Sequence, residues 1–299
     1  MKILIIGSEG FIGSNLVSYF TAKGVTVYKC DIVKTQIDNV NYRYYDGTNF
    51  REIFSDVKYD ICINASGAAN VSLSIQNPSL DYYLNVSHVF NILDAIRGTQ
   101  NPCKFIQFSS AAVYGNPKHL PINETDCINP LSPYGFHKWQ SEILCEEFFK
   151  LYNVPSVILR IYSVYGVGLK KQLFWDLYNK TKTNNELIIY GTGNESRDFI
   201  YIDDLSRAID EIIKYNVFDS SIYNVANGEE IFIKNAVNYF FKYLDWNGKY
   251  EFSGEKREGD PLNWKSNIDK LKDIGYNQSV SFEDGIKKYC KWLKELKLD

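Results

Sequence analysis

The chain has 299 residues, of which 45% are hydrophobic and 23% are charged, and its formal net charge at pH 7 is −3. This composition is typical of a soluble globular protein with one large domain or two smaller ones, and it lacks the excess of basic residues that favours nucleic acid or an anionic membrane as a partner. No apolar run reaches the roughly 20 residues that cross a bilayer, and the short run at residues 2–7 ends in a glycine, so we expect no signal peptide.

Predicted strands alternate with predicted helices along the first half of the chain. Continuous apolar runs indicate strands, and apolar residues spaced by three and four indicate helices. After about Gly166 the alternation loosens and the loops lengthen, which indicates a second, smaller region. In chain order, the expected strands are residues 2–6, 25–31, 41–47, 59–67, 103–110 and 155–166, and the expected helices are residues 11–24, 79–98 and 132–153.

The segment G-S-E-G-F-I-G, residues 7–13, follows the first expected strand and opens the first expected helix. Gly7 would permit a tight turn, Gly10 would let the backbone approach a pyrophosphate, and Gly13 would let the helix pack on the sheet. The phosphates would then meet free N–H groups at the helix N-terminus. The G-x-x-G-x-x-G spacing is a weak signal by itself, but its position predicts a dinucleotide-binding βαβ unit.

Asp31 ends the second expected strand, about 20 residues after the glycines, where a carboxylate binds the ribose hydroxyls of a dinucleotide. A carboxylate at this place would repel a 2′-phosphate, so Asp31 favours NAD over NADP. The alternative interpretation is an ordinary turn residue at the end of a strand.

Buried strands that alternate with helices favour a parallel sheet covered on both faces. We therefore predict an α/β fold, a Rossmann-type doubly wound parallel sheet with a smaller C-terminal α/β region that binds substrate. Residues 1–165 would form the NAD-binding domain. Residues 166–299 would be mainly the substrate-binding region, with residues from about 195 to 225 packing back on the first domain.

A second group of candidate residues surrounds the helix expected after residue 131. Ser132 can cap this helix and Pro133 can occupy its first position, which puts Tyr134 and Lys138 on one face. Ser110 ends an expected strand, and the carboxyl ends of strands are where an open α/β sheet binds ligands. A hydroxyl, a phenol and an ammonium group could therefore converge beside the dinucleotide, although a plain surface pair would have the same Tyr-x-x-x-Lys spacing.

The cysteines and histidines indicate neither disulfides nor a metal site. None of the six cysteines forms a C-x-x-C pair, and several lie within apolar runs, where a free cysteine behaves as a small hydrophobe. We therefore expect a reducing, cytoplasmic compartment. His88, His119 and His137 lack the spacing of metal ligands, so we expect no metal.

Taken together, these motifs resemble the extended short-chain dehydrogenase/reductases, in particular the NAD-dependent sugar-nucleotide epimerase/dehydratase family with its UDP-glucose 4-epimerases. The glycine and Tyr-x-x-x-Lys motifs occur throughout the superfamily, whereas ESRDFIYIDDL and REGD are narrower and point to sugar nucleotides. The resemblance runs nearly end to end and includes GSEGFIGSNL, NASGAANVSLSIQNP, FSSAAVYG, SPYGFHK, LRIYSVYG, GTGNESRDFIYIDDL, YNVANGEE and KREGDPLNW.

The resemblance implies site residues position by position. Tyr134 would be the catalytic acid/base, Lys138 its partner and Ser110 the catalytic hydroxyl. Arginines would hold the nucleotide diphosphate or ribose, because the planar guanidinium pairs with two phosphate oxygens. The residues implied to bind substrate are Ser110, Ser163, Arg197 and Arg257. The residues implied to bind NAD are Gly7, Gly10, Phe11, Ile12, Gly13, Asp31, Asp46, Gly47, Ala65, Ser66, Gly67, Tyr134 and Lys138.

This chemistry requires a phenol that can act as a base. An ordinary phenol has a pKa of about 10, and lowering it by roughly three units requires about 4 kcal/mol. We expect Lys138 and the positively charged nicotinamide to supply this free energy to Tyr134 in a dry site.

The chain also departs from the family pattern. Ala111 and Ala112 stand directly after Ser110, where dehydratases of the family usually place Asp and Glu, and neither alanine can move a proton to expel water. Ser163 stands where many epimerases have Asn, and Phe199 stands where some members have Tyr. The first departure disfavours a dehydratase, and the other two leave the sugar open.

The sequence thus predicts NAD-dependent epimerisation of a nucleotide-linked hexose, at C4 of a UDP-sugar, through a transient 4-keto intermediate. An NAD(P)H-dependent 4-ketosugar-nucleotide reductase would use the same residues, but Asp31 argues against NADPH. A dehydratase and a non-catalytic NAD-binding protein are weaker alternatives, the latter because Ser110, Tyr134 and Lys138 are intact. The family also implies a role in polysaccharide biosynthesis and a homodimer through the helices expected at 79–98 and 132–153, with no nucleic-acid or membrane partner.

Overall fold

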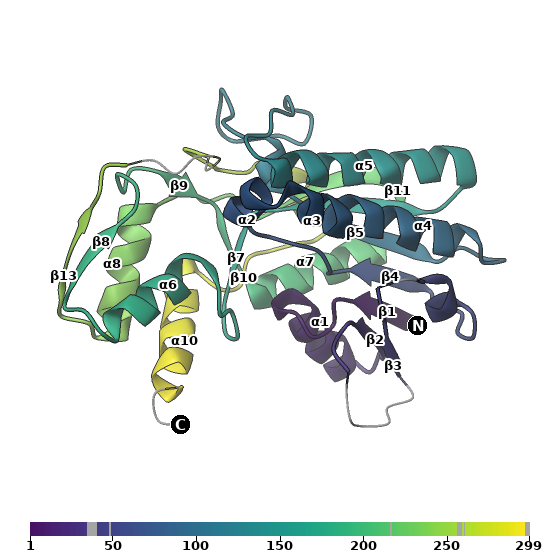
Figure 1. The fold of residues 1–299 in the computed structure, drawn as a ribbon, viewed down its shortest axis with the longest axis horizontal. Helices are drawn as coiled ribbons and strands as arrows, with labels where there is room; N and C mark the ends of the chain where they lie inside the picture. Colours follow the sequence, from purple (N-terminus) through teal and green to yellow (C-terminus); the bar gives the residue numbers. More distant parts are fainter. Residues whose placement is uncertain (35–40, 48, 216, 256–258, 260, 297–299) are drawn as a thin grey trace.

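Seven parallel strands form the centre of the molecule, in the order β11-β6-β5-β4-β1-β2-β3 (Figure 1). The structure is a computed structural model that describes residues 1–34, 41–47, 49–215, 217–255, 259 and 261–296. The strands of this sheet are β1 (Lys2–Ile6), β2 (Thr26–Asp31), β3 (Tyr42–Tyr44), β4 (Ile61–Asn64), β5 (Lys104–Ser110), β6 (Ser156–Ile161) and β11 (Asp219–Val225).

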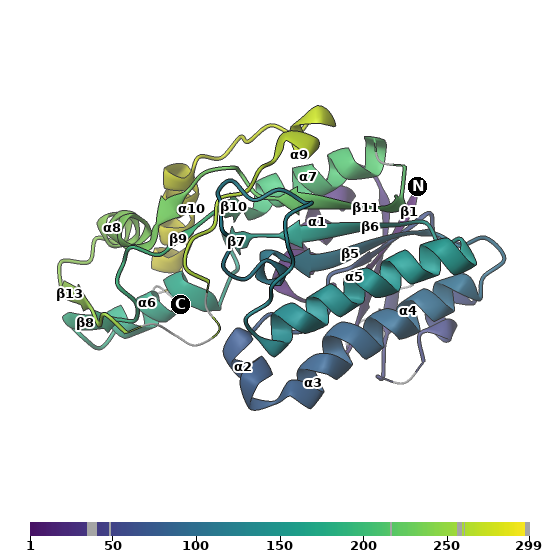
Figure 2. The same cartoon turned by 90° about the horizontal axis from the view of Figure 1, so that it is seen from above.

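Helices cover both faces of this sheet (Figures 1 and 2). Alternate residues of β1 face opposite sides: Ile3 and Ile5 pack in the cluster that contains Leu16, whereas Leu4 and Ile6 pack in the cluster that contains Ile92. Because both faces are buried, the strands read as continuous apolar runs, and the predicted doubly wound fold is confirmed. One face carries α1 (Phe11–Ala22) and α7 (Ile202–Tyr215), and the other carries α2 (Val71–Gln76), α3 (Pro78–Tyr82), α4 (His88–Arg97) and α5 (Pro133–Tyr152).

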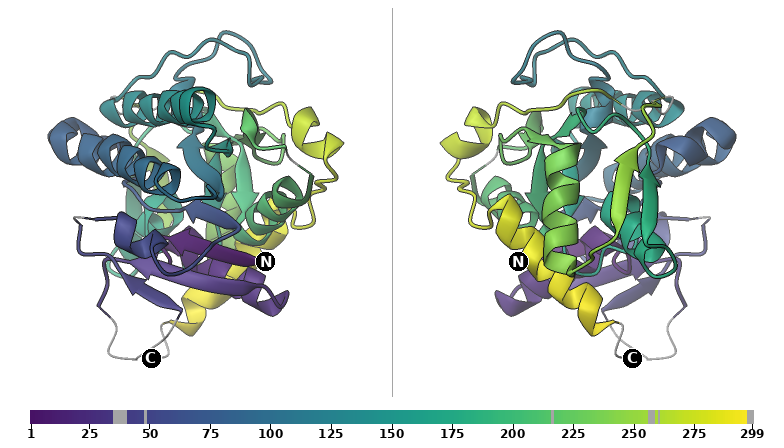
Figure 3. Two further views of the ribbon diagram at one scale, coloured as in Figure 1. Left: turned by 90° about the vertical axis from the view of Figure 1, so that its right-hand side faces the viewer. Right: turned by 90° about the vertical axis from the view of Figure 1, so that its left-hand side faces the viewer.

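A second, smaller region lies beside the sheet (Figures 1 and 3). Residues 202–225 run back from it, so that α7 packs against α1 and β11 joins the central sheet beside β6. Within the described ranges, no helix is both long and apolar enough to cross a membrane. The elements of this region are α6 (Gln172–Thr181), β8 (Glu186–Ile189), β9 (Ser196–Arg197), β12 (Ile231–Phe232), α8 (Ile233–Leu244), β13 (Lys249–Phe252) and α10 (Phe282–Glu295).

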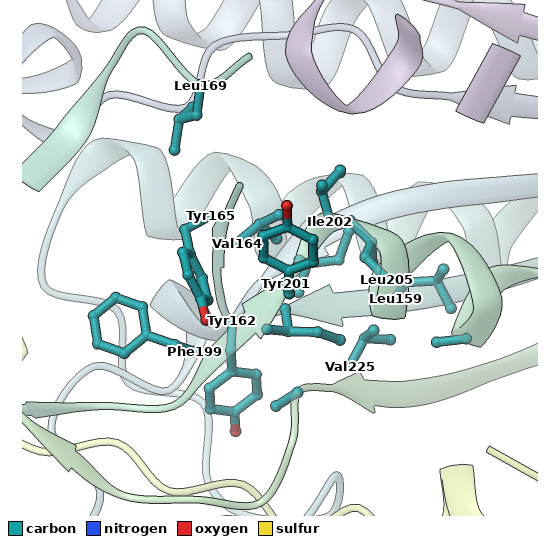
Figure 4. Close-up of a cluster of buried hydrophobic side chains, with 14 of the residues drawn as sticks. Leu159, Tyr162, Val164, Tyr165, Leu169, Phe199, Tyr201, Ile202, Leu205 and Val225 are labelled. Atoms are coloured by element: carbon teal, nitrogen blue, oxygen red, sulfur yellow. The ribbon is translucent and has the colours of Figure 1, made fainter. Parts of the chain in front are cut away.

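An aromatic cluster joins the two regions (Figure 4). Tyr165 lies in β7 (Ser163–Tyr165), and its ring packs edge-on against that of Phe199 in β10 (Phe199–Tyr201). The Tyr165 hydroxyl donates a hydrogen bond to the carbonyl oxygen of Phe282 at 2.9 Å. One continuous apolar core therefore extends from the sheet into the smaller region.

The strand expected at 155–166 divides at Tyr162. Its first half is β6 of the central sheet, and its second half, β7, pairs with β10 in a separate small sheet. The division follows from backbone bonding, because Tyr162 N–H donates to Val225 whereas Ser163 N–H donates to Asp198.

Two other expected boundaries also shift. The expected helix at 79–98 contains a π-helical turn, η2 (Tyr83–Ser87), between α3 and α4, and π-helical turns are frequent at functional sites. Strand β3 ends at Tyr44, so Asp46 and Gly47 lie in the loop that follows it.

Candidate active site

The glycine turn after β1 is closed by backbone contacts. Gly7 has a φ of +83°, and a Cβ added there would lie 2.7 Å from the backbone of Ala65 and Ser66. A Cβ at Gly13 would lie 2.0 Å from the carbonyl oxygen of Gly7. Helix α1 begins at Phe11 after Gly10, which has no side chain to cap the helix, so the first N–H groups of α1 remain available to an anion.

Asp31 lies beside this turn. Its Oδ2 accepts a hydrogen bond from Glu9 N–H at 2.9 Å, and its Oδ1 accepts one from Ile32 N–H at 2.8 Å. A carboxylate has about four lone-pair positions, so two more acceptor positions remain for hydroxyl donors. The contact with Glu9 fixes the carboxylate next to the turn that would hold a pyrophosphate.

The loop that follows β4 forms a third part of the candidate cofactor site. Gly67 has a φ of +109°, and a Cβ there would lie 2.7 Å from Oδ1 of Asn85 in the π-helical turn. That oxygen is buried and has no hydrogen-bond partner among the described residues. A buried carbonyl without a donor is unfavourable, so the position suits a ligand that donates a hydrogen bond. Nearby, the hydroxyl of Tyr83 donates to the carbonyl oxygen of Gly47 at 2.9 Å.

These three features together fit a dinucleotide. The glycine turn leaves room where side chains would collide, and Asn85 offers an unsatisfied acceptor next to Gly67. The predicted positions Phe11 and Ile12 form the first residues of α1 at this place. No cluster of His, Cys, Asp and Glu suited to a metal ion occurs in the part of the chain that the structure describes.

The start of α5 holds the second group of candidates. Ser132 caps the helix by accepting a hydrogen bond from Gly135 N–H at 3.2 Å, with Pro133 in the first turn. The N–H group of Tyr134 donates to the hydroxyl of Ser74 at 3.1 Å. The Tyr134 side chain is buried, and its phenol interacts with the side chain of Ser110 at the end of β5.

Lys138 lies one helical turn after Tyr134 and is also buried. Its Nζ donates to the carbonyl oxygen of Phe108 at 3.0 Å and lies 5.9 Å from the centroid of the Tyr134 ring. The same carbonyl accepts a bond from Gln107 Nε2, and Gln107 Oε1 accepts from Asn64 Nδ2 at 2.9 Å. Because Ser66 bonds to Asn64 at 2.6 Å, a buried polar chain links the loop at Ser66 to Lys138.

Burial sets the acid–base properties of this pair. It raises the pKa of Tyr134 to about 12, against the hydrogen bond from Ser110, and it lowers the pKa of Lys138 to about 8, against the negative charges of Asp81 and Glu142. The expected lowering of the Tyr134 pKa requires the positive charge of the nicotinamide as well as that of Lys138, and in the protein alone burial has the opposite effect. The physical reason is that the phenol is dry and that the Lys138 ammonium group is bonded to the Phe108 carbonyl.

The arginine predicted at 197 lies where the smaller region meets the loop after Ser110. Its Nη1 donates to the carbonyl oxygens of Ser196 at 2.8 Å and Leu262 at 3.2 Å. Its guanidinium carbon lies 5.4 Å from the ring centroid of Trp264. Two further bonds connect this segment to the loop, from Leu262 N–H to Asn116 at 2.7 Å and from Trp264 Nε1 to Gly115 at 3.0 Å.

Of the two remaining substrate candidates, the structure describes Ser163 but not Arg257, although it does describe Gly259 two residues after Arg257. Ser163 pairs with Phe199 between β7 and β10. Gly259 passes close to α2 and α5, because a Cβ there would lie 3.0 Å from Val71 and 3.5 Å from Ser132. Arg257 lies outside the described residues.

Sequence reasoning missed four polar residues around α5: Ser74, Asp81, Asn85 and His137. All except His137 are at most 2% exposed. Three of them lie in the helical segments at residues 71–87, where each could equally have been a solvent-facing polar residue. Only the packing of these segments against α5 shows that these polar side chains are buried and do not face solvent. For His137, the sequence SPYGFHK already showed that it stands beside Lys138.

Comparisons with known proteins agree with this geometry. The model of the NAD dependent epimerase/dehydratase family matches residues 3–226. A protein of Methanocaldococcus jannaschii, provisionally named UDP-glucose 4-epimerase, is 29% identical, and the match covers 98% of each chain. The structure of a UDP-glucose 4-epimerase from Thermotoga maritima with UDP-glucose is similar with a TM-score of 0.89, 25% identity and full coverage of both chains. That of a UDP-glucuronic acid 4-epimerase from Bacillus cereus with UDP-glucuronic acid and NAD has a TM-score of 0.88 and 25% identity, covering 99% of this chain and 100% of the other.

Proposed function

Because the chain belongs to the NAD dependent epimerase/dehydratase family, we propose that it inverts C4 of a UDP-linked hexose through a transient 4-keto intermediate. The observation that carries this proposal is the convergence of three groups at the carboxyl end of β5: Ser110 interacts with the buried Tyr134 phenol, and Lys138 Nζ lies 5.9 Å from the centroid of the Tyr134 ring. Ala111 and Ala112 support inversion over dehydration, because neither can give a proton to a leaving hydroxyl. The UDP-sugars bound in the two similar epimerase structures support the choice of nucleotide.

NAD is the cofactor of this family, and it supplies an acceptor and donor of hydride. The glycine turn would hold its pyrophosphate at the N-terminus of α1, and Asp31 would accept hydrogen bonds from the adenosine ribose. Asp46 and Gly47 would lie near the adenine. The unpaired Oδ1 of Asn85, beside Gly67, would accept a further hydrogen bond.

The residues of α5 and β5 would do the proton chemistry. Tyr134 would remove the proton of the C4 hydroxyl and later return it, so the proton stays on the Tyr134 oxygen between the two half-reactions. Ser110 would donate a hydrogen bond to the same sugar oxygen and stabilise its developing charge. The Lys138 ammonium group would stabilise the Tyr134 phenolate, whose pKa of about 12 in the protein alone must fall before it can act as a base.

The smaller region would bind the nucleotide sugar. Arg197, already oriented by two carbonyl groups and Trp264, would hold the diphosphate or ribose together with Arg257. Ser163 would lie near the hexose. In this proposal residues 1–165 bind the cofactor and the C-terminal part mainly binds the substrate.

The test is an assay with UDP-, GDP- and dTDP-hexoses, each with the unchanged protein and with Arg197→Ala. Loss of a charge-assisted bond to the diphosphate costs about 1.5–3 kcal/mol, so KM for the UDP-sugar should rise roughly 10- to 150-fold with kcat little changed. Arg51→Ala is the matched control, because Arg51 is an exposed arginine that forms an ion pair with Asp94 of α4. Equal turnover of free hexose, or an unchanged KM in Arg197→Ala for all three nucleotides, would contradict the proposal.

We also propose a homodimer, formed by α4 and α5 pairing with the same helices of a second copy. The two helices lie side by side (Figures 1 and 2) and carry exposed apolar side chains, namely Phe90, Phe136, Ile143, Leu151 and Tyr152. Apolar surface of this kind on neighbouring helices is typical of an interface. Sedimentation at micromolar concentration should give a dimer, and a monomer would contradict this part of the proposal.

A further inference from the structure

The buried carboxylate of Asp81 in α3 contacts the imidazole of His137 in α5, next to the proposed acid–base residues. Oδ2 of Asp81 and Nδ1 of His137 are 2.6 Å apart, and the other carboxylate oxygen of Asp81 accepts a hydrogen bond from Asn85 Nδ2 at 3.1 Å. Asp81 is 2% exposed, and the ring of Tyr82 packs edge-on against the imidazole. His137 immediately precedes Lys138 and follows Tyr134 by three residues, so the pair belongs to the same turn of α5.

The charge of Asp81 acts on both proposed acid–base groups. At Tyr134 it adds to the burial that raises the pKa of the phenol, and at Lys138 it opposes the burial that lowers the pKa of the ammonium group. Both effects favour the protonated forms. The size of this influence depends on whether His137 is charged, because an imidazolium at 2.6 Å neutralises most of the carboxylate's field.

Among the described residues, the other charged groups that face this part of α5 are Glu142 and Arg160, and they form a separate pair. Glu142, one turn beyond Lys138, is bound to Arg160 of β6 by two hydrogen bonds of 3.0 and 2.8 Å, and it also accepts one from Ser109. Arginine stays charged at all accessible pH values, so this pair has a constant net charge. From α2 the neutral Ser74 faces Tyr134. The Asp81–His137 pair is different, because histidine changes charge between pH 5 and 8.

We propose that the charge state of the Asp81–His137 pair controls the acid–base work of Lys138 and Tyr134, which makes His137 a positioning residue for the proposed reaction. The effect on turnover rests on the proposed function, but the coupling between the groups does not. When His137 is protonated the pair is neutral, and the phenolate of Tyr134 forms more easily. When His137 is neutral the pair carries one negative charge, which holds the proton on Tyr134 and on Lys138.

The coupling can be measured without turnover, because linkage between two sites is reciprocal. If His137 influences Lys138, then removing the ammonium group in Lys138→Met must raise the pKa of His137. Two charges within one helical turn predict a rise of roughly half a unit to one unit. The probe is the NMR titration of the histidine ring signals, which come from three residues only, and His137→Asn identifies the signal. Lys150→Met, an exposed lysine farther along α5, is the control and should leave the titration unchanged. An equal His137 titration in wild type and Lys138→Met would overturn the inference.

Turnover gives the second readout, with two variants that have opposite signs. Asp81→Asn removes a negative charge and should move the acid limb of the kcat/KM profile to lower pH. His137→Asn leaves Asp81 uncompensated and should move the same limb to higher pH. A purely structural role would lower activity in both variants without opposite shifts, and that result would contradict the inference. If no variant shows turnover while the NMR coupling is present, the proposed function fails and the coupling stands.

Discussion

The cofactor half of the candidate site is shaped by backbone contacts, whereas the substrate half is shaped by side chains. Around the glycine turn, backbone meets backbone: the space that a Cβ of Gly13 would need is occupied by the carbonyl group of Gly7. Around Arg197 the contacts involve side chains: the guanidinium lies over the Trp264 ring, and Asn116 Oδ1 accepts a hydrogen bond from Leu262 N–H. The first half recognises a constant ligand shape, whereas the second half can change its ligand by exchange of side chains.

This difference explains why the cofactor is settled and the sugar is not. A turn with no free volume accepts only glycine, so the same motif recurs wherever the same pyrophosphate is bound. A side-chain site tolerates substitution, so the residues at Ser163 and Phe199, where the resemblance leads us to expect Asn and Tyr, leave the sugar open. Tyr134 and Lys138 combine both kinds of contact, because their side chains would take part in the proposed reaction while the backbone carbonyl of Phe108 in β5 holds Lys138.

The largest effect is expected in the backbone half. Gly13→Ala should destabilise the fold by at least about 3 kcal/mol, because overpacking against a rigid backbone cannot relax, and NAD binding should be lost with it. Gly98→Ala is the matched control, since a Cβ there would meet neighbours at an ordinary 3.5 Å. Thermal unfolding measures the stability of both variants. A Gly13→Ala protein with wild-type stability would contradict the claim that rigid backbone contacts shape the cofactor half.

The second effect is catalytic and not structural. Tyr134→Phe removes one hydroxyl, so kcat should fall by roughly 10²–10⁴-fold, the usual contribution of a general acid–base group. Folding and NAD binding should stay nearly intact. Steady-state kinetics measure the loss of turnover, and titration with NAD measures cofactor binding. A Phe variant with wild-type kcat would exclude Tyr134 as the base.

The third effect is on stability and depends on pH. The pKa of Lys138 is lowered from an ordinary 10.5 to about 8 in the folded chain by burial. Between pH 8 and 10.5 the unfolded chain therefore binds a proton that the native state does not, so this group makes stability rise with pH. Lys138→Met should be more stable than wild type at pH 7, and the advantage should shrink by about 3 kcal/mol by pH 10.5.

Denaturant unfolding at a series of pH values measures this difference. The exposed Lys150→Met variant should show no such pH dependence. A constant difference between Lys138→Met and wild type from pH 7 to 10.5 would mean that Lys138 carries no burial penalty.

The smallest effect is expected at Asp31. Asp31→Ala should weaken NAD binding about tenfold, the value of a charge-assisted hydrogen bond, and should narrow the preference for NAD over NADP. Asp31→Asn separates charge from hydrogen bonding, because the amide can still accept the bond from Glu9 N–H. Asp31→Asn should narrow the preference for NAD over NADP with a smaller loss of NAD affinity than Asp31→Ala. An unchanged cofactor preference in both variants would refute the assignment of Asp31 to the adenosine ribose.

The sequence predicted most of the fold because strand and helix periods are local. In KILII every residue after Lys2 is apolar, and CKFIQFSS has neighbouring apolar residues at Phe105 and Ile106. Adjacent apolar residues in a strand point to opposite faces, so this pattern indicates burial on two faces. The division at Tyr162 was missed, because the bonds that end β6 and begin β7 come from Val225 and Asp198, which are distant in the chain. Likewise, the π-helical turn at 83–87 has no local signal comparable to a glycine or proline.

For the site, motifs predicted the residues whose spacing is fixed by one turn or one helix, such as Gly7, Gly13, Tyr134 and Lys138. The contact of Asp81 with His137 and the acceptor of Asn85 arise from the packing of separate helical segments, so no spacing rule reveals them. The direction of the Tyr134 pKa shift in the protein alone depends on tertiary burial and on the carbonyl that binds Lys138, and no sequence motif reveals either of them.

The most direct test of the proposed reaction follows a hydrogen isotope. A UDP-hexose with deuterium at C4 is converted by the protein with a stoichiometric amount of NAD, and the label is located by NMR. Inversion through a 4-keto intermediate predicts that the product epimer keeps deuterium at C4, with none in free cofactor or at C6. Deuterium at C6 would indicate dehydration, deuterium in released NADH would indicate net oxidation, and either result would contradict epimerisation at C4.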